Sequence, residues 1–492
     1  MPASQPASRS HTIATTELRA GALKFPAILM QGITHIAPAV GLVLSIQFVA
    51  SIAGVTAPLA YLLAFVIILT LGVSLMQLAR HLPSAGGYYT YISRTVHPRA
   101  GFLTAWLYFL YDPTSTAINL AFMGFFFEST MRVQYGVRFP WWLFFLIATV
   151  LITTLVYRGI ALSTGVMAFL ATAEILIVVA LCGFGLARPG PGGLNVEAYL
   201  PARAPSVNGL YLAVVFSIFL FTGFDAVAPL AEESEDPRRN LPRAIMGSIL
   251  LTGLFFVFCS WAVLAGWGTG NIGGFVHSAE NPCFVLARKL WGKAWVLVFI
   301  AVLNSVVAVS IACTNAATRV FFAMGRSGAL PRILGQVHPK YRTPSNAIWL
   351  QTLITLAVGL GLGFWIGPEQ EYYFMGVVIT LGLVFVYGVS NYGVYRFYRG
   401  EKQQEFRIWQ HALCPLISTV ALIWVGVEAI FPLPPAPLLY APALVGVWLA
   451  AGCVLVWWMS RTGREAWLLK AGEIAHETPL PGAQVSLGQT GD

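Results

Sequence analysis

The feature that most constrains this chain is its series of long apolar stretches. Twelve of them are long enough to cross a bilayer, each near the roughly 20 residues that a spanning helix needs. They run over about residues 25–52, 56–79, 100–127, 140–157, 161–187, 207–231, 244–267, 294–322, 346–366, 372–395, 410–431 and 438–460. Charged residues make up 10% of the chain, against about 25% in an average soluble domain. Because lipid leaves backbone polar groups no water to bond, the sequence predicts an all-α membrane protein.

The positions of the basic residues predict how the chain lies in the membrane. With the N-terminus in the cytoplasm, 22 of the 29 Lys and Arg residues fall in inside tails and loops and 7 fall outside. This asymmetry follows the positive-inside rule, so the net charge of +9 reflects topology and gives no reason to expect a nucleic-acid partner. We expect a multi-pass protein of the cell (plasma or inner) membrane with both termini in the cytoplasm. The polar first 22 residues argue against a removed signal peptide.

Cofactor and metal motifs are missing from the sequence. The six cysteines are scattered and include no Cys-x-x-Cys pair, so neither a disulfide framework nor a zinc site is predicted. There is no P-loop and no Gly-rich strand-to-helix turn, which gives no support for ATP or dinucleotide binding. We therefore expect no cofactor, no metal and no enzymatic activity, and any transport would be secondary.

Two of the apolar stretches are interrupted at corresponding places. The first carries Gly32–Gly41, which includes Pro38, and the sixth carries Thr222-Gly223-Phe224-Asp225. Proline and glycine both weaken a helix, and a carboxylate at lipid depth is costly unless it lines a cavity. Matched breaks in two five-helix halves indicate a transporter binding site near the midplane. The alternative, that Gly and Pro are simply common in membrane helices, is weaker for two matched breaks than for one.

Several motifs resemble those of amino acid–polyamine–organocation (APC) permeases. The segment Thr222–Asp225, with Glu232-Glu233 and residues 236–245 after it, closely resembles the sixth-helix signature of that family. Further resemblance lies in residues 82–91, 315–331 and Thr343-Pro344. The resemblance covers about residues 22–400. It implies a LeuT-like fold of ten helices in a five-plus-five inverted repeat, with helices 1 and 6 unwound, that moves amino acids or related amines by alternating access.

This resemblance predicts four parts along the chain. They are a cytoplasmic N-terminal tail over 1–22, an inverted-repeat transporter core over 23–400, two appended helices over 401–462, and a cytoplasmic C-terminal tail over 463–492. The small solute, the coupling ion and the lipid bilayer are the expected partners, and the oligomeric state is left open.

The first helix departs from the family pattern. Typical amino acid members carry a Gly-Ser/Ala-Gly run whose backbone amides hold the substrate carboxylate, and Thr34–Ala39 lacks that run. The flanking Gly32 and Gly41 still permit unwinding, and helix-end amides still attract a carboxylate. Polyamines, ethanolamine-like amines and amino acid derivatives therefore stay open beside amino acids.

Polar groups at membrane depth are the candidates for substrate binding. Asp225 either meets an ammonium group or caps freed backbone amides, and His35 either binds substrate or bonds a carbonyl. Asp112 either binds a cation or hydrogen-bonds the backbone groups left free by the following proline, and we favour the second, structural role. Phe221 and Phe224 are candidates for an aromatic gate. The predicted substrate-binding set is Thr34, His35, Ala37, Gly41, Asp112, Phe221, Gly223, Phe224 and Asp225.

The coupling ion is predicted from three residues. Glu174 lies in the middle of the fifth stretch, where burial favours a protonated carboxyl, so it is the candidate proton carrier; the alternative is a structural acid bonded to a neighbouring helix. Ser310 and Thr314, one helical turn apart, occupy the region where sodium-coupled relatives place hydroxyl ligands. Since most such hydroxyls bond their own backbone, we favour proton over sodium coupling.

Acidic and basic residues at the cytoplasmic ends are candidates for gating. Glu232 and Glu233 could pair with Arg319 when the inner side closes, although most exposed pairs contribute little.

The sequence as a whole predicts a proton-coupled symporter, a secondary active permease for amino acids or small amines. Sodium coupling and amine or polyamine exchange remain alternatives. From other classes, a channel would show flux without saturation, and a ligand-sensing transceptor would bind its ligand with little flux. An intramembrane hydrolase could use Asp112 and Asp225, but it would need two specific motifs facing each other, and only one is present. A transceptor would be expected to have a long output domain, whereas only about 30 residues follow residue 461.

Overall fold

The computed structural model describes residues 18–431 and 435–462, and the two predicted tails lie mostly outside them, at 1–17 and 463–492. Within the described residues the protein is all-helical and has no β-strand. Ten segments are long and apolar enough to cross a membrane. They contain eleven of the twelve predicted stretches, because the segment Phe25–His81 contains the first two.

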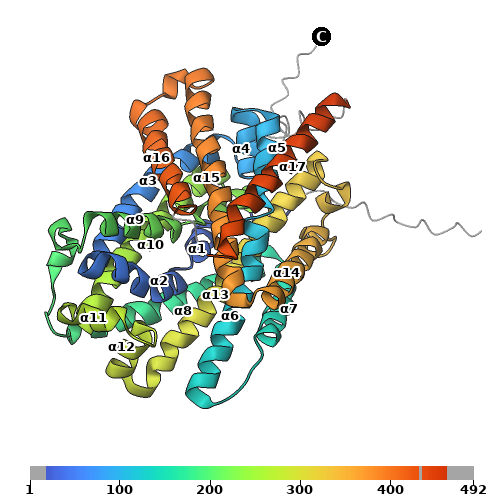
Figure 1. The fold of residues 1–492 in the computed structure, drawn as a ribbon. Helices are drawn as coiled ribbons and strands as arrows, with labels where there is room; N and C mark the ends of the chain where they lie inside the picture. The colour runs from blue at the N-terminus through green and yellow to red at the C-terminus, as the bar shows by residue number, and fades with distance from the viewer. Residues whose placement is uncertain (1–17, 432–434, 463–492) are drawn as a thin grey trace, which may run out of the picture.

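Figure 1 labels the helices in chain order. Their bounds are α1 Phe25–Ile36, α2 Pro38–Ala53, α3 Ala57–His81, α4 Tyr88–Thr95, α5 Pro98–Tyr108, α6 Asp112–Tyr135, α7 Trp141–Arg158, α8 Ile160–Ala187, α9 Val207–Phe219, the 3-10 helix η4 Phe224–Glu233, α10 Pro237–Trp267, α11 Ile272–Val276, α12 Pro282–Trp291, α13 Val296–Ser327, α14 Ser345–Trp365, α15 Pro368–Gly400, α16 Cys414–Glu428 and α17 Ala441–Arg461.

The segment Phe25–His81 is too long for a single crossing. Its 57 residues would reach about 85 Å as one straight helix, against a hydrocarbon core of about 30 Å. The chain bends at Ala37, which has a φ of 54°, and again at Gly54, which has a φ of 61°. These bends divide the segment into α1, α2 and α3.

The third predicted stretch is not one continuous helix, which corrects the expectation of an uninterrupted span over 100–127. Helix α5 ends at Tyr108 and α6 begins at Asp112, with Tyr111 between them at φ −113° and ψ −103°. The physical reason is Pro113, which lacks an N–H and clashes with a preceding helical turn, so that it is accommodated in the first turn of α6.

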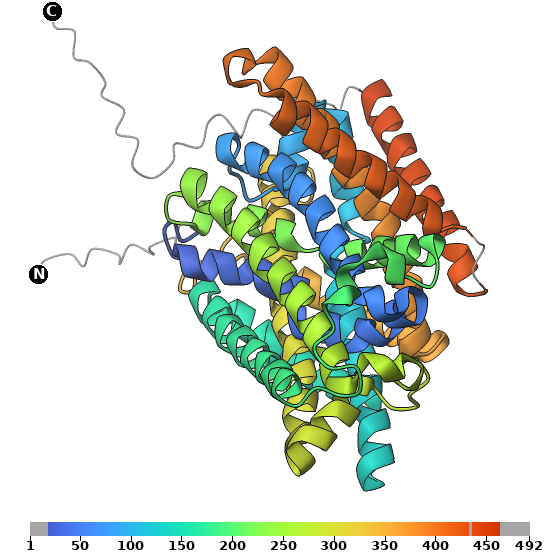
Figure 2. The same ribbon diagram turned by 90° about the vertical axis from the view of Figure 1, so that its left-hand side faces the viewer.

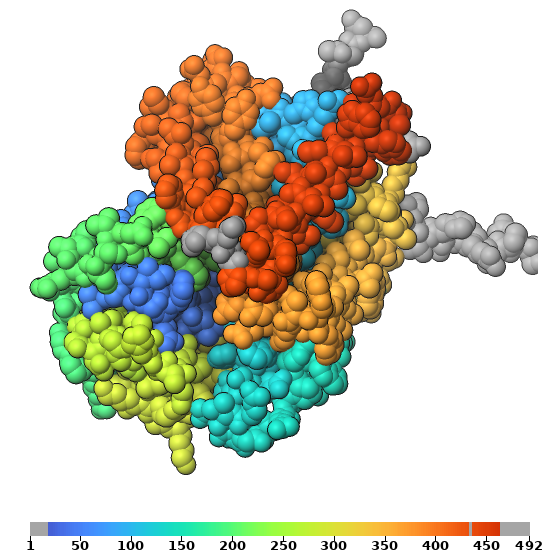
Figure 3. Space-filling model, in the orientation of Figure 1, coloured from blue at the N-terminus to red at the C-terminus, as the bar shows by residue number. Residues whose placement is uncertain are grey.

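Helix α1 lies at the centre of the bundle. It contacts α10, α8, α13 and η4, while α3 packs along α10 and α13 packs on both α8 and α6. The last two helices lie at the side, α16 against α15 and α3, and α17 against α15 and α5 (Figure 2). The space-filling view shows α16 and α17 covering one flank of the molecule (Figure 3).

The outer helices present apolar side chains to the surroundings. Phe169 on α8 is 73% exposed and Trp365 at the end of α14 is 79% exposed. A soluble monomer rarely exposes so many large apolar groups together, and a lipid environment removes that cost. The buried polar residues, among them Asp112, Glu174 and Asp225, lie in the interior of the bundle.

Candidate functional site

Two helix interruptions touch at the centre of the bundle. Helix α1 ends at Ile36 and the chain turns at Ala37 before α2, while α9 ends at Phe219 and the chain turns at Gly223, which has a φ of 111°. A Cβ atom on Gly223 would lie 2.9 Å from the carbonyl oxygen of His35 and would overlap its ring. Only glycine combines this positive φ with so close an approach. The structure thus brings Thr34–Gly41 and Thr222–Asp225 together.

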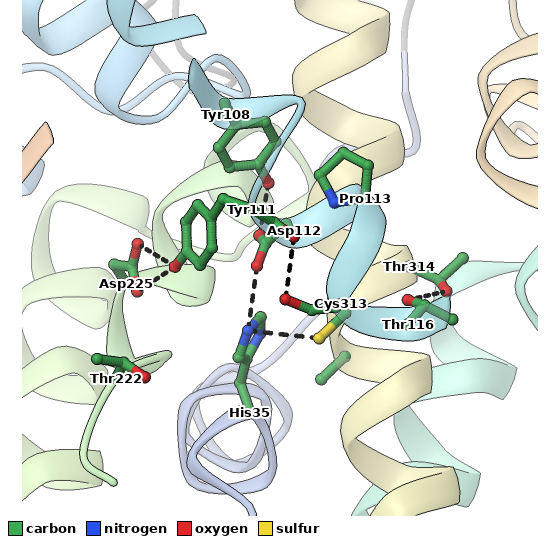
Figure 4. Close-up of polar contacts among 12 residues, drawn as sticks. His35, Tyr108, Tyr111, Asp112, Pro113, Thr116, Thr222, Asp225, Cys313 and Thr314 are labelled. Atoms are coloured by element: carbon green, nitrogen blue, oxygen red, sulfur yellow. Dashed lines mark hydrogen bonds and ion pairs between the residues drawn. The ribbon is translucent and has the colours of Figure 1, made fainter. Parts of the chain in front are cut away.

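A third interruption, between α5 and α6, adds side chains to the same centre. Asp112 is the first residue of α6, where the positive end of the helix dipole favours a carboxylate. Its Oδ2 accepts a hydrogen bond of 2.5 Å from the Tyr108 hydroxyl, and its Oδ1 lies 3.2 Å from His35 Nε2 (Figure 4). Asp112 is 2% exposed. Its carboxylate therefore faces a histidine as well as the start of its own helix.

The second carboxylate, Asp225, is bonded by tyrosines. The Tyr111 hydroxyl lies 2.9 and 3.1 Å from its two oxygens, and the Tyr387 hydroxyl donates to Oδ1 at 3.0 Å. Asp225 is 5% exposed and is the second residue of η4 (Figure 4 shows the contact with Tyr111). All these partners are neutral hydroxyls, and Asp225 forms no ion pair with the described residues.

A narrow cleft adjoins both carboxylates, and its volume of about 350 Å³ includes the open solvent at its mouth. Besides Asp112 and Asp225 it is lined by residues of the α3–α4 loop, α4, α5, η4 and α13, among them Gly87, Tyr88, Tyr108 and Val320. The Tyr88 ring lies 5.5 Å from that of Tyr387, between centroids. Acidic groups beside aromatic rings suit a cationic guest.

The other residues predicted to bind substrate do not line this cleft. Phe221 packs in the apolar core against Phe65 and Phe256, and Phe224 lies near Tyr387, with ring centroids 6.0 Å apart. Thr34 is buried and its hydroxyl has no hydrogen-bond partner in the described part of the chain. Ala37 packs against Val309 and Cys313, and Gly41 faces the Phe256 ring.

His35 lies between the two interrupted regions and α13. Besides Asp112, its Nε2 atom contacts the Cys313 thiol at 3.5 Å. Its Nδ1 atom is buried and makes no hydrogen bond to any described residue. The carbonyl partner considered from the sequence is therefore not what the ring contacts.

Several tyrosines of the site were missed by the sequence reasoning. Tyr108 and Tyr111 lie within one turn of Asp112, and this proximity was the signal that could have identified them. Tyr88 and Tyr387 are 299 residues apart, among 18 tyrosines, and nothing in their local sequence connects them to Asp225.

Glu174 connects α8 to α13 and α2. Its carboxyl is fully buried; Oε1 accepts a hydrogen bond of 2.9 Å from the Ser305 hydroxyl, and Oε2 has no partner among the described residues. The Ser305 oxygen in turn accepts a bond of 3.3 Å from the backbone N–H of Val40, in the first turn of α2. The Ser305 hydroxyl thus connects the Glu174 carboxyl to the backbone at the interruption between α1 and α2.

Ser310 and Thr314 lie on α13 near a second, smaller cleft. Thr314 donates to the Ser310 carbonyl at 2.8 Å and lies 3.3 Å from the Thr116 hydroxyl (Figure 4). The Ser310 hydroxyl is buried and unbonded within the described residues. This cleft, of about 180 Å³, is lined by Thr116, Thr314, Gln351 and further threonines of α7 and α14.

An ion-pair cluster, formed by Glu232, Glu233, Arg319 and Arg326, lies between η4 and α13. Arg319 Nε donates to Glu233 Oε2 at 2.8 Å, and both side chains are at most 1% exposed. Arg326 donates to both carboxylate oxygens of Glu232. Glu233 and Arg319, considered as partners from the sequence, are in contact here, and their pair is buried rather than exposed. Removing one partner of a buried pair leaves an uncompensated charge, at a cost of about 3–5 kcal/mol.

The residues before α1 are bound to the same region. The N–H of Leu23 donates to the Glu233 carbonyl at 2.9 Å, and the N–H of Glu235 donates to the Leu23 carbonyl at 2.8 Å. Two main-chain hydrogen bonds thus tie the N-terminal approach to the end of η4.

Comparison with known proteins gives one family over most of the chain. Residues 27–459 match the family model described as amino acid permease. The low-affinity putrescine importer PlaP of Escherichia coli (strain K12) is 26% identical over 381 residues, which cover 75% of this chain and 81% of that protein. The branched-chain amino acid permease BcaP of Bacillus subtilis is 27% identical, covering 62% of this chain and 68% of that protein. The histidine permease HisP of Lactococcus lactis is 25% identical, covering 76% and 80%.

Proposed function

Because the chain belongs to the amino acid permease family, we propose that it is a secondary active transporter that imports a small amine-bearing solute together with protons. The relatives named above carry putrescine, branched-chain amino acids and histidine according to their names, so amine-bearing solutes are common to them. The multi-pass, all-helical architecture supports transport across a membrane.

The observation that carries the proposal is the contrast between the two buried carboxylates. Asp112 faces His35, whereas Asp225 is bonded only by tyrosine hydroxyls and borders the cleft. Burying a carboxylate is costly unless a cation pairs with it. An ammonium group of the substrate supplies that cation at Asp225. The rings of Tyr88 and Tyr387 would add cation–π attraction.

Glu174 is proposed as the proton carrier. It has no basic partner among the described residues, and only one of its oxygens is hydrogen-bonded. In such a setting the neutral acid is favoured, and loss of the proton places a charge beside Ser305 and the start of α2. Protonation at Glu174 would thereby be linked to the conformation of the α1–α2 interruption, which borders the substrate site.

We propose a LeuT-like arrangement for the alternating access. The interruptions at Ala37 and Gly223 fall in the first and sixth predicted stretches, as two inverted five-helix halves require. In this scheme α16 and α17 are the two appended helices, the chain crosses twelve times, and the charge asymmetry places both termini in the cytoplasm. The ion-pair cluster then closes the cytoplasmic side, and opening must separate Glu233 from Arg319.

The proposal is tested by reconstituting the purified protein in liposomes with labelled amino acids, mono- and diamines. We expect saturable uptake of at least one amine, with accumulation driven by an inward proton gradient. Asp225→Asn should abolish it. Glu371→Gln should not, because Glu371 is a buried acid on α15 away from the cleft.

Three results would contradict the proposal. Flux that never saturates would indicate a channel, and binding without flux would indicate a transceptor. Accumulation that follows an imposed sodium gradient and ignores the proton gradient would shift the coupling site to Ser310 and Thr314.

A further inference from the structure

Three side chains of different chemistry converge beside the cleft from three helices. His35 lies at the end of α1, Asp112 at the start of α6 and Cys313 on α13 (Figure 4). The imidazole nitrogen, the carboxylate oxygen and the thiol sulfur all lie within 4.8 Å of one another. They are 7%, 2% and 1% exposed. No local motif indicates this cluster, because its members are up to 278 positions apart.

We propose that His35, Asp112 and Cys313 form a binding site for a zinc-class divalent metal ion. Neutral imidazole, carboxylate and thiolate are the three kinds of zinc ligand in proteins. Calcium and magnesium prefer oxygen ligands only, so a set containing sulfur and nitrogen selects against them.

Two of the three separations between ligand atoms match tetrahedral coordination, and the third, between Asp112 and Cys313, is at most 4.8 Å. Zinc bond lengths of about 2.0–2.2 Å to N and O and about 2.3 Å to S place tetrahedral neighbours about 3.3 Å apart for N and O and about 3.6 Å apart for N and S. The observed separations are 3.2 Å between His35 Nε2 and Asp112 Oδ1 and 3.5 Å between His35 Nε2 and Cys313 Sγ.

The bonding of Asp112 agrees with this arrangement. Its Oδ1 atom is buried and faces the His35 ring at 3.2 Å, but it makes no hydrogen bond of good geometry with any described residue. Buried carboxylate oxygens normally have a hydrogen-bond or metal partner. A metal ion between the three ligands would satisfy this oxygen. Its binding would release the Cys313 thiol proton to solvent, since the thiolate is the ligand.

The consequence for the protein follows from where the ligands lie. One ion would join α1, α6 and α13, and it would share Asp112 with the cleft that this residue lines. Bound metal would therefore hold three elements together and compete with a cationic guest for Asp112. This part of the inference rests on the proposed transport function, whereas metal binding does not.

The binding test uses the purified full chain in detergent, with exposed Cys453 replaced by Ser to remove an accessible thiol. Titration with Co²⁺ should give one ion per chain and a thiolate-to-cobalt absorption band, and Zn²⁺ should displace it. Cys313→Ser should lose the band and weaken binding by at least about tenfold. Cys283→Ser, which removes a buried thiol elsewhere, should leave both unchanged.

Two outcomes would overturn the site. One is that the Cys453→Ser protein gives no saturable Co²⁺ binding, and the other is that Cys313→Ser keeps the same band. Circular dichroism and a single gel-filtration peak would establish that the variants are folded. In liposomes, Zn²⁺ should inhibit amine uptake by the Cys453→Ser protein and inhibit the Cys313→Ser variant at least about tenfold less strongly. Equal inhibition of both proteins would show that metal bound at this site does not compete with the amine substrate.

Discussion

At the scale of single residues, the molecule distinguishes two acids that look alike in the sequence. Asp112 lies at a helix start beside His35, and Asp225 lies in a cage of tyrosine hydroxyls. The sequence favoured a structural role for Asp112, yet its carboxylate borders the same cleft as Asp225. Local sequence shows what a residue is next to along the chain, and only the fold shows what faces it.

Replacing Asp225 by Asn should remove substrate binding. The neutral amide leaves the buried ammonium group without its counter-charge, which costs about 2–5 kcal/mol, or a loss in affinity of about thirtyfold or more. Tyr387→Phe removes one hydrogen bond to Asp225 and should cost about 0.5–1.5 kcal/mol. Binding of the labelled amine to the purified protein measures both, with Glu371→Gln as the control. Unchanged affinity in Asp225→Asn would refute the role.

Replacing Glu174 by Gln should uncouple transport from protons. The amide mimics the protonated acid permanently, so downhill uptake should persist while accumulation against a gradient is lost. Uptake should also stop responding to pH, because the titrating group is gone. Tracer uptake in liposomes with and without an imposed pH gradient measures this. Full proton-driven accumulation by the variant would exclude Glu174 as the carrier.

At the scale of elements, three helix interruptions form the site. Two of them could be predicted from the sequence, and the third could not. The breaks at Ala37 and Gly223 lie within Gly- and Pro-containing segments and were predictable from local chemistry. The break at Phe109–Tyr111 falls within an apolar run without Gly or Pro, and Pro113 was its only local signal. Pro113 accounts for the break, but a proline inside a membrane helix can also produce only a kink. The sequence alone therefore does not distinguish a kinked helix from two separate helices.

Gly223→Ala tests the contact between two interruptions. The added methyl group meets the carbonyl of His35 in a backbone conformation that L-residues rarely adopt, which costs about 1–3 kcal/mol. We expect a lower melting temperature in detergent and reduced uptake. Gly376→Ala is the matched control, since a Cβ atom there meets nothing within 4 Å. Equal melting temperatures for the two variants would contradict the close approach.

At the scale of the whole molecule, composition and the distribution of charge were enough to predict an all-helical membrane protein. The all-helical membrane architecture and the membership of the permease family are confirmed. The twelve crossings, the orientation and the site roles stay predictions, because they depend on a bilayer and a substrate. The burial of Glu233 and Arg319 could not be predicted either, since no local sequence feature distinguishes a buried ion pair from an exposed one.

Arg319→Ala should open the cytoplasmic side if, as we propose, the ion-pair cluster closes it. Removing one partner leaves Glu233 charged and buried, at a cost of about 3–5 kcal/mol, so the closed state loses population. A cysteine at Ala226, on the cleft wall, should then react faster with an impermeant maleimide in inside-out vesicles. The vesicles should carry the Cys453→Ser background.

The matched control is Arg203→Ala, which breaks an exposed pair with Glu197 and should change nothing measurable. The combined charge exchange Glu233→Arg with Arg319→Glu should restore part of the protection. If Arg319→Ala labels no faster than Arg203→Ala, the cluster does not hold the cleft closed.

The main-chain bonds between Leu23 and the end of η4 also order events during synthesis. Leu23 leaves the ribosome 210 residues before Glu233, its partner. At about 5–20 residues per second, that interval lasts about 10 to 40 seconds. The residues just before α1 therefore remain without this partner while six apolar stretches are synthesised. The first residues of the described chain are thus among the last to reach their final neighbours, and a nascent chain stopped before residue 233 cannot make this connection.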